Sequence, residues 1–381
     1  MSFDDLTPAD LRRRGSLKWT KFGGDTIGAF VAEMDFGTAP PIVAALHRAI
    51  DTISFGYLPP QLQQQLAQAC AGWLRRRYGW AVGPEQIYPV TDVLTAFELV
   101  MLHYSRPGSP IILPTPAYMP LLRVPPMHGR RVIQVPMRHE DGRYRLDLAG
   151  IDRAFRAGGD LLVLCNPVNP VGRVYTAAEL AEVTEVVERH GGVVFADEVH
   201  APLVYPGHQH IPYASTSPAA AAHTITATAA SKAWDLPGLK CAQVILSNPA
   251  HEECWLRVAV EDPAAPSNLG VVAAIAAYES GEPWLDQVLG YLDGNRRAVA
   301  DLLAEHAPAI GYTPPEGTYL AWLDCRKLEL SGPLGELVRE RAGVAVVDGA
   351  ECGEAGRGFL RLNFATPRPV LREAITRLGS L

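Results

Sequence analysis

Three uninterrupted apolar runs in the middle of the chain each lead into polar residues. The runs and the polar residues after them are Leu161–Leu164 with Asn166 and Asn169, Val193–Ala196 with Asp197, and His223–Ala230 with Ser231 and Lys232. Runs that are apolar throughout, without alternation, predict strands buried on both faces. Between the first two runs, Ala178–Arg189 carries apolar residues at helical spacing. This order of strand, helix and strand predicts an α/β fold, with a mostly parallel sheet between helices and right-handed crossovers.

The polar residues after these runs form one set of chemical groups. In an open α/β sheet, ligands bind beyond the carboxyl ends of the strands, so these side chains are expected to meet around one small molecule. An enzyme that uses pyridoxal phosphate needs an amine that condenses with the cofactor aldehyde and a carboxylate that keeps the pyridine nitrogen protonated. It also needs donors for the 3'-oxygen and the phosphate. Lys232, Asp197, Asn169 and Ser231 supply one of each, which predicts a pyridoxal 5'-phosphate site.

The length of the chain, 381 residues, favours a large domain with a smaller one attached. Residues 1–45 are irregular and punctuated by glycine and proline, and we expect an arm that packs with the small domain. Residues 46–275 are expected to form the large cofactor-binding domain, with a helix at Gln61–Tyr78. Residues 276–381 are expected to form a small α+β domain. Its predicted strands, after a segment that is helical from Leu269 through Arg297, are Tyr319–Leu323, Val344–Val347 and Phe359–Asn363.

Composition and charge exclude several classes of partner. Lysine and arginine number 34 and aspartate and glutamate 41, a formal net charge of −7, so nucleic acid is not expected as a partner. The longest nearly uncharged apolar run, Leu269–Tyr278, is too short to span a bilayer, and Met-Ser-Phe-Asp-Asp at the N-terminus lacks the features of a secretory signal. The six cysteines show no Cys-x-x-Cys spacing, so neither a disulfide framework nor a metal site is expected. We therefore expect a cytoplasmic protein that acts on a small molecule.

Several longer stretches, spread from near residue 18 to near residue 367, form a highly specific combination, although Asn-Pro or Ser-Lys alone is a weak signal. They are Lys18-Trp19, Val31-Ala-Glu-Met-Asp-Phe36, Phe55-Gly-Tyr57, Cys165-Asn-Pro-Val-Asn-Pro-Val-Gly-Arg-Val174, Asp197-Glu-Val-His200, Ser231-Lys232, Gly238-Leu-Lys240, Trp284-Leu-Asp286, Gly294-Asn-Arg296 and Phe359-Leu-Arg-Leu-Asn363. Through them the chain resembles the fold-type I pyridoxal phosphate enzymes of the class I/II aminotransferase superfamily. Within these it resembles the MalY/PatB group of cystathionine β-lyase-like proteins. The resemblance implies a seven-stranded sheet between helices and a smaller C-terminal domain.

The segment Pro89–Val100 turns from a strand end into a helix, and backbone amides at a helix start can hold a phosphate. By resemblance, Thr91-Asp92-Val93 is the phosphate-binding turn of the family. Many members carry a glycine where this chain has Asp92. Since a carboxylate that faces a phosphate dianion is repelled, we expect the Asp92 side chain to cap the helix and point away. Only the backbone amides of Asp92 and Val93 are then expected as phosphate ligands.

The resemblance implies further roles for single residues. Tyr118 resembles the aromatic residue that stacks on the pyridine face, and Ser231 and Lys240 resemble the hydroxyl and cationic ligands of the phosphate. Arg361 resembles the arginine that grips the substrate α-carboxylate with a bidentate fork. Tyr57 resembles a residue that reaches the phosphate of the neighbouring subunit. That role implies an obligatory homodimer with a shared active site.

Some of these residues also have purely structural interpretations. Lys232 is alternatively an exposed loop lysine, and Asp197 a cap at a strand end. Asn169 is expected to donate to the 3'-oxygen and is alternatively a turn residue before a proline, where a cis bond is expected. His200 lies where many aminotransferases of this fold carry a tyrosine that reaches the 3'-oxygen, and its alternative is a structural histidine.

The resemblance implies β-elimination from an amino acid that Arg361 holds, with Lys232 as the general base at Cα. A thiolate leaves from the β-carbon of L-cystathionine or an L-cysteine S-conjugate, and the products are a thiol, pyruvate and ammonia. Three alternatives stay open: an aminotransferase, a decarboxylating oxidative deaminase of a cysteine conjugate in a natural-product pathway, and a regulatory protein-binding role. Trp19, Phe22 and Tyr57 are candidate walls of the substrate pocket, with core packing as the alternative for the first two.

Overall fold

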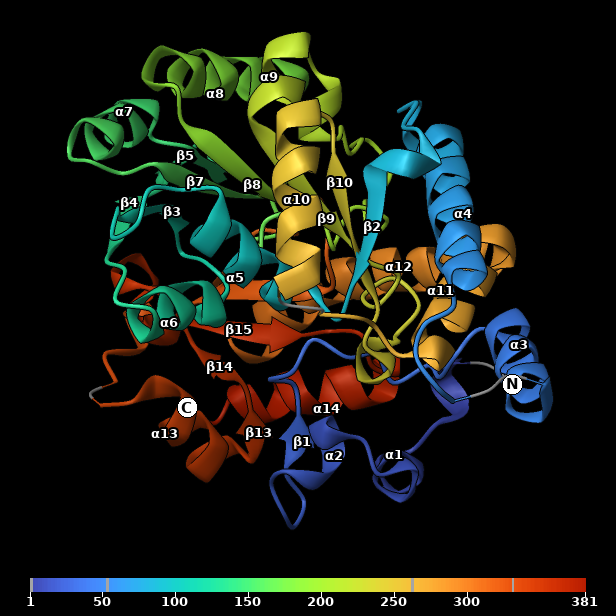
Figure 1. Ribbon diagram of the computed structural model, residues 1–381. Helices are drawn as coiled ribbons and strands as arrows, with labels where there is room; N and C mark the ends of the chain where they lie inside the picture. The colour runs from blue at the N-terminus through green and yellow to red at the C-terminus, as the bar shows by residue number, and fades with distance from the viewer. Residues whose placement is uncertain (1–2, 53–54, 262–263, 331) are drawn as a thin grey trace.

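The computed structural model describes residues 3–52, 55–261, 264–330 and 332–381. Its largest sheet has seven strands in the order β2-β10-β9-β8-β7-β3-β4 (Figure 1). Their bounds are Ile87–Val90 (β2), Ala242–Leu246 (β10), Thr224–Thr228 (β9), Val193–Asp197 (β8), Leu161–Cys165 (β7), Ile111–Thr115 (β3) and Val132–Pro136 (β4). β10 is antiparallel to both of its neighbours, and the other adjacent pairs are parallel. The predicted mostly parallel, seven-stranded sheet is therefore confirmed.

Helices cover both faces of this sheet. They are α5 (Val93–His103), α6 (Met119–Met127), α7 (Leu148–Arg156), α8 (Ala177–His190), α9 (Pro218–His223) and α10 (Pro249–Glu261). Leu161 and Val163 of β7 belong to an apolar cluster with α5, α6 and α10, whereas Leu162 and Leu164 belong to a cluster with α7, α8 and α9. Successive side chains of a strand point to opposite faces. Both faces of β7 are thus buried, which explains its uninterrupted apolar sequence.

A second sheet, of four strands in the order β11-β12-β15-β14, lies in the C-terminal part of the chain. Its strands are Gly311–Tyr312 (β11), Leu320–Asp324 (β12), Phe359–Asn363 (β15) and Val347–Asp348 (β14). The strands predicted at Tyr319–Leu323 and Phe359–Asn363 are confirmed, the first with a shift of one residue. The single strand predicted at Val344–Val347 is wrong, because the chain changes sheets there. β13 (Val344–Ala345) pairs with β1 (Ile27–Gly28), whereas β14 pairs with β15.

The helices outside the large sheet include α4 (Pro60–Tyr78), α11 (Asn268–Ser280), α12 (Glu282–His306), α13 (Leu334–Ala342) and α14 (Arg368–Leu378). Three of these correspond to predicted helical segments, and α13 and α14 were not predicted. α4 is the helix predicted at Gln61–Tyr78. The segment predicted to be helical from Leu269 through Arg297 consists of two helices, α11 and α12, which meet at Gly281. The carbonyl oxygen of Gly281 accepts a hydrogen bond from the indole nitrogen of buried Trp234 at 2.9 Å.

The first 45 residues are more regular than we predicted. They contain α1 (Pro8–Arg14), α2 (Leu17–Thr20), β1 and the start of α3 (Pro40–Thr52). α1 begins at a capping box, in which Thr7 and Asp10 accept from each other's backbone amides, and it ends at Gly15 in the left-handed conformation. Both features are strong local helix signals. They outweigh the glycine and proline content that suggested an irregular segment.

The N-terminal arm packs against the C-terminal part of the chain. The backbone N–H of Asp35 donates to Ala365 O at 3.1 Å. The carboxylate of Asp35 forms a buried ion pair with Lys18 at 2.8 Å and accepts from Trp19 Nε1 at 2.8 Å. These contacts agree with the predicted arm. The domain boundaries at residues 45 and 275 stay a prediction.

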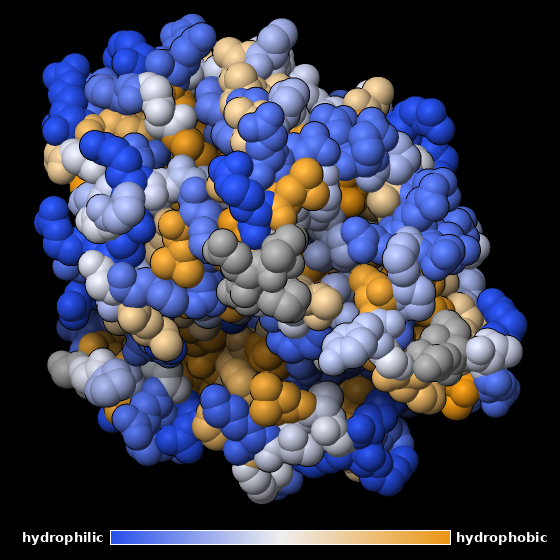
Figure 2. Space-filling view, in the orientation of Figure 1, coloured by the Kyte–Doolittle hydropathy of each residue, from blue (hydrophilic) through white to orange (hydrophobic). Residues whose placement is uncertain are grey.

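Figure 2 shows a hollow with apolar atoms on its floor, in the orientation of Figure 1. It lies between the upper part of the molecule, which carries the seven-stranded sheet, and the lower part, which carries α13, α14 and β1. Residues of the arm, of the large sheet and of the four-stranded sheet also line one common cavity.

In the part of the chain that the structure describes, no helix is long and apolar enough to cross a membrane.

Candidate active site

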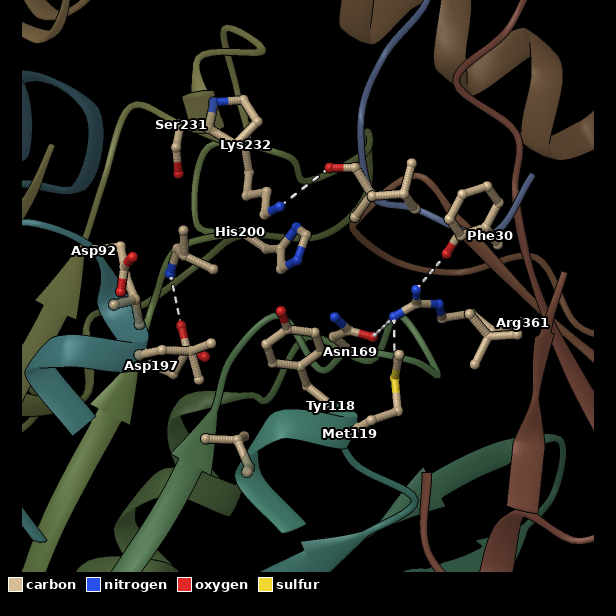
Figure 3. A pocket seen from close by; sticks show the side chains of 18 of the residues that line it. Phe30, Asp92, Tyr118, Met119, Asn169, Asp197, His200, Ser231, Lys232 and Arg361 are labelled. Carbon is tan, nitrogen blue, oxygen red and sulfur yellow. Dashed lines mark hydrogen bonds between the residues drawn. The ribbon is translucent and has the colours of Figure 1, made fainter. Parts of the chain in front are cut away.

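A cavity of about 470 Å³ gathers the polar side chains that follow the central strands. Asn169 follows β7, Asp197 ends β8 and Lys232 follows β9, and all three line this cavity (Figure 3). The carboxyl ends of parallel strands meet at the same edge of a sheet, which brings together residues that are far apart in the sequence. Phe30 of the arm and Arg361 of β15 line the cavity on the side away from the large sheet.

The Lys232 side chain points into the cavity, where its Nζ donates to Ala32 O at 3.1 Å (Figure 3). Burial and the positive charge of Arg361 lower the pKa of Lys232 from its ordinary value, although three nearby carboxylates act in the opposite direction. A lysine whose charged form is disfavoured supplies a neutral amine more readily. Condensation with an aldehyde requires such an amine.

Asp197 is buried at the end of β8 and faces the same cavity as Lys232 (Figure 3). One of its carboxylate oxygens accepts the backbone N–H of Val199 at 3.2 Å. Burial raises the pKa of Asp197 to about 6. A cation beside this carboxylate, such as a protonated ring nitrogen, would favour its ionised form. The environment of Asp197 therefore fits the predicted partner of a pyridine nitrogen.

Two buried nitrogens that belong to residues lining the cavity have no hydrogen-bond partner among the described residues: Nδ1 of His200 and Nε of Arg361. Burial, together with the charges of Lys232 and Arg361, lowers the pKa of His200 to about 3, so its imidazole is neutral at physiological pH. Buried polar atoms without a partner are costly unless a ligand satisfies them. With the amine and the carboxylate nearby, these nitrogens make the residues present fit pyridoxal phosphate.

Arg361 is held at one end of the cavity by two hydrogen bonds. Its guanidinium donates to Asn169 Oδ1 at 3.0 Å and to Phe30 O at 2.7 Å (Figure 3). Because an arginine only donates, the Asn169 atom that faces it is the amide oxygen, and the amide nitrogen is left to donate to a ligand. The guanidinium of Arg361 is fixed in place and its Nε has no partner among the described residues, which agrees with the predicted binding of the substrate α-carboxylate.

Tyr118 immediately precedes α6, and its ring lies in the cavity near Asn169 (Figure 3). Burial raises the pKa of its hydroxyl, which therefore stays protonated. An aromatic side chain at this place is available to pack against a planar ring. The structure thus brings Tyr118 into the predicted set of residues.

Asp92, Ser231 and Lys240 line another part of the cavity. Asp92 is the N-cap of α5, and its Oδ1 accepts from the backbone N–H of Thr95 at 2.9 Å, as we expected. Its second oxygen, Oδ2, accepts from Lys240 Nζ at 2.8 Å. No local sequence pattern indicated this ion pair. Lys240 therefore lies where the phosphate ligand was predicted, but Asp92 already binds its ammonium group. Val93, the first residue of α5, lines the cavity as well.

Tyr57 does not line the cavity of its own chain, and its side chain is fully exposed, at 101%. The role predicted for it therefore requires a second subunit. Of the other candidate walls, Phe22 lines the cavity. Trp19, which belongs to the arm, is buried at 4% exposure and is not part of the lining, which favours its core-packing alternative.

The carbonyl oxygens of the arm are site groups that sequence reasoning missed. Ala32 O accepts from Lys232 and also from the hydroxyl of Tyr319, at 3.0 Å. Val31 O accepts from Asn363 Nδ2 at 2.7 Å. Every residue carries a backbone carbonyl, so no residue type signals such a role. The arm is thereby tied to the segment that carries Lys232 and to the four-stranded sheet.

Comparisons with known proteins agree with this site. The family model for aminotransferase class I and II matches residues 31–378. The chain is 38% identical to a cystathionine β-lyase of Corynebacterium glutamicum, over 100% of both proteins, and 31% identical to the cystathionine β-lyase PatB of Bacillus subtilis, over 95% of both. A crystal structure from Corynebacterium diphtheriae, described as a pyridoxal phosphate-dependent β-cystathionase, is similar with a TM-score of 0.93 and 39% identity. The match covers 98% of this chain and 97% of that one.

Proposed function

Because the chain belongs to the class I and II aminotransferase family, within its cystathionine β-lyase-like MalY/PatB group, we propose that it is a pyridoxal phosphate-dependent carbon–sulfur β-lyase. Its substrate is L-cystathionine or an L-cysteine S-conjugate, and its products are a thiol, pyruvate and ammonia. The observation that carries the proposal is the presence of Lys232, Asp197 and Arg361 on one cavity of a chain whose full-length relatives are named cystathionine β-lyases.

Arg361 binds the substrate, and Lys232 removes a proton from it. The guanidinium, held by Asn169 and Phe30, binds the α-carboxylate and orients the bond between Cα and its hydrogen. Nζ of Lys232 takes the Cα proton in its neutral form, which burial favours by lowering the pKa of this lysine. When bound, pyridoxal phosphate supplies an electron-withdrawing ring that makes this proton removable. Asp197 would pair with the protonated ring nitrogen of the cofactor, and Tyr118 would pack against its ring.

We also propose that the protein is a homodimer in which Tyr57 contributes to the site of the neighbouring subunit. Tyr57 and Phe55 are exposed, at 101% and 65%, and the preceding α3 exposes Val43 and Ile50. Large apolar side chains gathered on one surface region are typical of an interface between protein subunits.

A cytoplasmic location is proposed as well, and the free state of all six cysteines agrees with a reducing compartment.

A pyruvate assay tests the lyase proposal directly. Purified protein loaded with pyridoxal phosphate is incubated with L-cystathionine or S-ethyl-L-cysteine, and pyruvate, ammonia and free thiol are measured. We expect the three products in equal amounts, without any added keto acid. The same protein is then assayed for amino transfer to 2-oxoglutarate and for release of carbon dioxide.

The three outcomes separate the alternatives. Equal yields of pyruvate and thiol support the lyase. Amino transfer without pyruvate identifies an aminotransferase, and carbon dioxide release identifies the decarboxylating deaminase. The Lys232→Ala variant serves as the matched control, since it should abolish every one of these products. A biological effect that this variant retained in full would instead indicate a regulatory role.

A further inference from the structure

The end of the cavity where α5 begins contains a pair of opposite charges. Asp92 Oδ2 accepts from Lys240 Nζ at 2.8 Å, while Asp92 Oδ1 accepts from the backbone N–H and the hydroxyl of Thr95, at 2.9 and 3.0 Å. Both charged residues line the cavity, as does Ser231. The side chain of Asp92 is therefore turned onto its own helix and onto one cation, and both of its oxygens are bound.

The backbones on both sides of this ion pair are fixed. The N–H of Thr91 donates to Ala264 O at 3.0 Å. Lys240 has a left-handed backbone, with φ of 53°, and its carbonyl accepts from the N–H of Ser267 at 3.2 Å. Gly270 approaches closely here, because a Cβ at that position would lie 2.1 Å from Leu239 O. The start of α11 thus holds the backbone of the turn that carries Lys240, while the paired side chains of Lys240 and Asp92 are partly exposed, at 55% and 34%.

The ion pair changes the charge that an incoming phosphate meets. Burial opposes the ionisation of Asp92, but the hydrogen bonds from Lys240 and Thr95 outweigh it and hold the pKa of Asp92 below its ordinary value, so the residue is an anion at physiological pH. A phosphate that binds beside Lys240 must share the ammonium with this anion. The positive side chain at this end is thereby neutralised, and the remaining donors are uncharged: the amides at the start of α5 and the hydroxyl of Ser231.

We propose that Asp92 is a positioning residue that weakens the hold on the cofactor phosphate by competing for Lys240, so that pyridoxal phosphate dissociates from this chain more readily than it would without the Asp92 carboxylate. The inference rests on the cofactor of the proposed function and concerns this chain's own charge arrangement. A residue without a carboxylate at position 92 would leave the ammonium of Lys240 unshared. Asp92 acts through Lys240 and not by direct contact with the phosphate, since its two oxygens are bound elsewhere.

The Asp92→Asn variant tests the proposal through binding of the cofactor to the cofactor-free protein. Asparagine caps a helix as well as aspartate does but carries no charge. We expect about a tenfold lower dissociation constant for pyridoxal phosphate and a slower release on dilution, because the Lys240 charge is no longer shared. The dissociation constants come from titrations followed by absorbance and tryptophan fluorescence. Asp92→Ser, a second uncharged cap, provides the same measurement if Asp92→Asn has a folding defect.

Two controls isolate the phosphate. Pyridoxal, which lacks the phosphate, should bind the wild-type and Asp92→Asn proteins with equal affinity. Asp152→Asn changes the net charge of the chain by the same amount, yet Asp152 lies on α7 in an ion-pair cluster with Arg156 and Arg189, outside the cavity lining. This variant should leave both dissociation constants unchanged.

A double-mutant cycle with Lys240→Met tests whether Asp92 acts through the lysine. We expect Lys240→Met to weaken binding of pyridoxal phosphate and to abolish the gain from Asp92→Asn. An equal gain in both backgrounds, or an equal gain with pyridoxal, overturns the proposal, as does an unchanged dissociation constant in both uncharged variants. The measurement needs no substrate. Loss of the lyase activity alone would therefore refute the proposed function and leave this inference standing.

Discussion

Burial disfavours the charged forms of two residues at the centre of the cavity. It raises the pKa of Asp197 to about 6 and lowers that of Lys232. Without a bound cation, the ionised carboxylate of Asp197 lacks the compensation that a protonated ring would provide. The ionised side chain of Asp197, the predicted partner of the pyridine nitrogen, therefore destabilises the cofactor-free protein at neutral pH. Ligand sites commonly carry such a cost, because they are shaped for a group that is not part of the chain.

Asp197→Asn should stabilise the cofactor-free protein at pH 7. The pKa of Asp197 rises from 3.8 in the unfolded chain to about 6 in the folded protein, so its contribution to stability is full below pH 4 and is lost as the pH rises through 6. Removal of the ionisable group should raise the free energy of unfolding by on the order of 2 kcal/mol at pH 7 and by almost nothing at pH 4. Urea unfolding of both proteins at the two pH values measures this. A gain of the same size at pH 4 would contradict the electrostatic explanation.

Arg361→Lys should impair substrate binding more than folding. A lysine keeps the charge but cannot form the bidentate fork, nor bridge Asn169 and Phe30 as the guanidinium does. We expect KM for S-ethyl-L-cysteine to rise by about 30-fold or more, which corresponds to about 2 kcal/mol, with the cofactor still bound. Steady-state kinetics and the cofactor absorbance measure the two effects. Arg153→Lys, at an exposed position paired with Asp147 and outside the cavity lining, is the control and should change KM little. An unchanged KM in Arg361→Lys would exclude Arg361 as the carboxylate ligand.

At the level of elements, the arm is the segment that completes the cavity. Phe30 O holds Arg361, Ala32 O holds Lys232, and the N–H of Met34 donates to the buried carboxylate of Asp235 at 2.9 Å. The part of the arm that contacts Arg361, Lys232 and Asp235 lies within residues 29–39, which contain no helix or strand, and β1 before it spans only two residues. Its position therefore depends on buried side-chain contacts, chiefly those of Asp35.

Lys18→Met should destabilise the protein strongly, because it leaves the buried carboxylate of Asp35 without its cation. The ammonium of Lys18 is fully buried and also donates to Ala365 O at 3.1 Å. The removal of one partner of a buried ion pair costs about 3–5 kcal/mol, whereas the replacement of both partners costs less. Urea unfolding of Lys18→Met and of Lys18→Met/Asp35→Leu should show the double variant as the more stable of the two. If the second substitution made stability worse still, the ion pair would not be the main contact of the arm.

At the level of the whole molecule, a single chain does not bring every predicted site residue to its own cavity. Eleven residues were predicted for the site, and ten of them line the cavity: Asp92, Val93, Tyr118, Asn169, Asp197, His200, Ser231, Lys232, Lys240 and Arg361. Tyr57 is fully exposed instead. The exposed position of Tyr57 is compatible with a role in the site if Tyr57 reaches the cavity of a neighbouring subunit across an interface. A homodimer allows it, because each subunit then completes the other.

Subunit mixing tests this arrangement. Lys232→Ala and Tyr57→Ala proteins should each be nearly inactive, yet their mixed dimers contain one intact site out of two. After unfolding and joint refolding at equal amounts, we expect about a quarter of the wild-type activity. Lys232→Ala mixed with Arg361→Ala is the control, since those two residues belong to one cavity and no mixed dimer restores it. Recovery in the control, or none in the test mixture, would count against a shared site, and size-exclusion chromatography with light scattering measures the assembly.

The sequence by itself determined the central sheet and the identity of most groups in the cavity. Strands buried on both faces carry few charged residues, and Asn169, Asp197 and Lys232 could be predicted from their places at or shortly after the ends of such strands. Only the tertiary structure decided the split of residues 344–347 between two sheets and the ion pair of Asp92 with Lys240. Those features depend on contacts between segments distant in the sequence, and no local pattern of residue types encodes which partner a side chain meets.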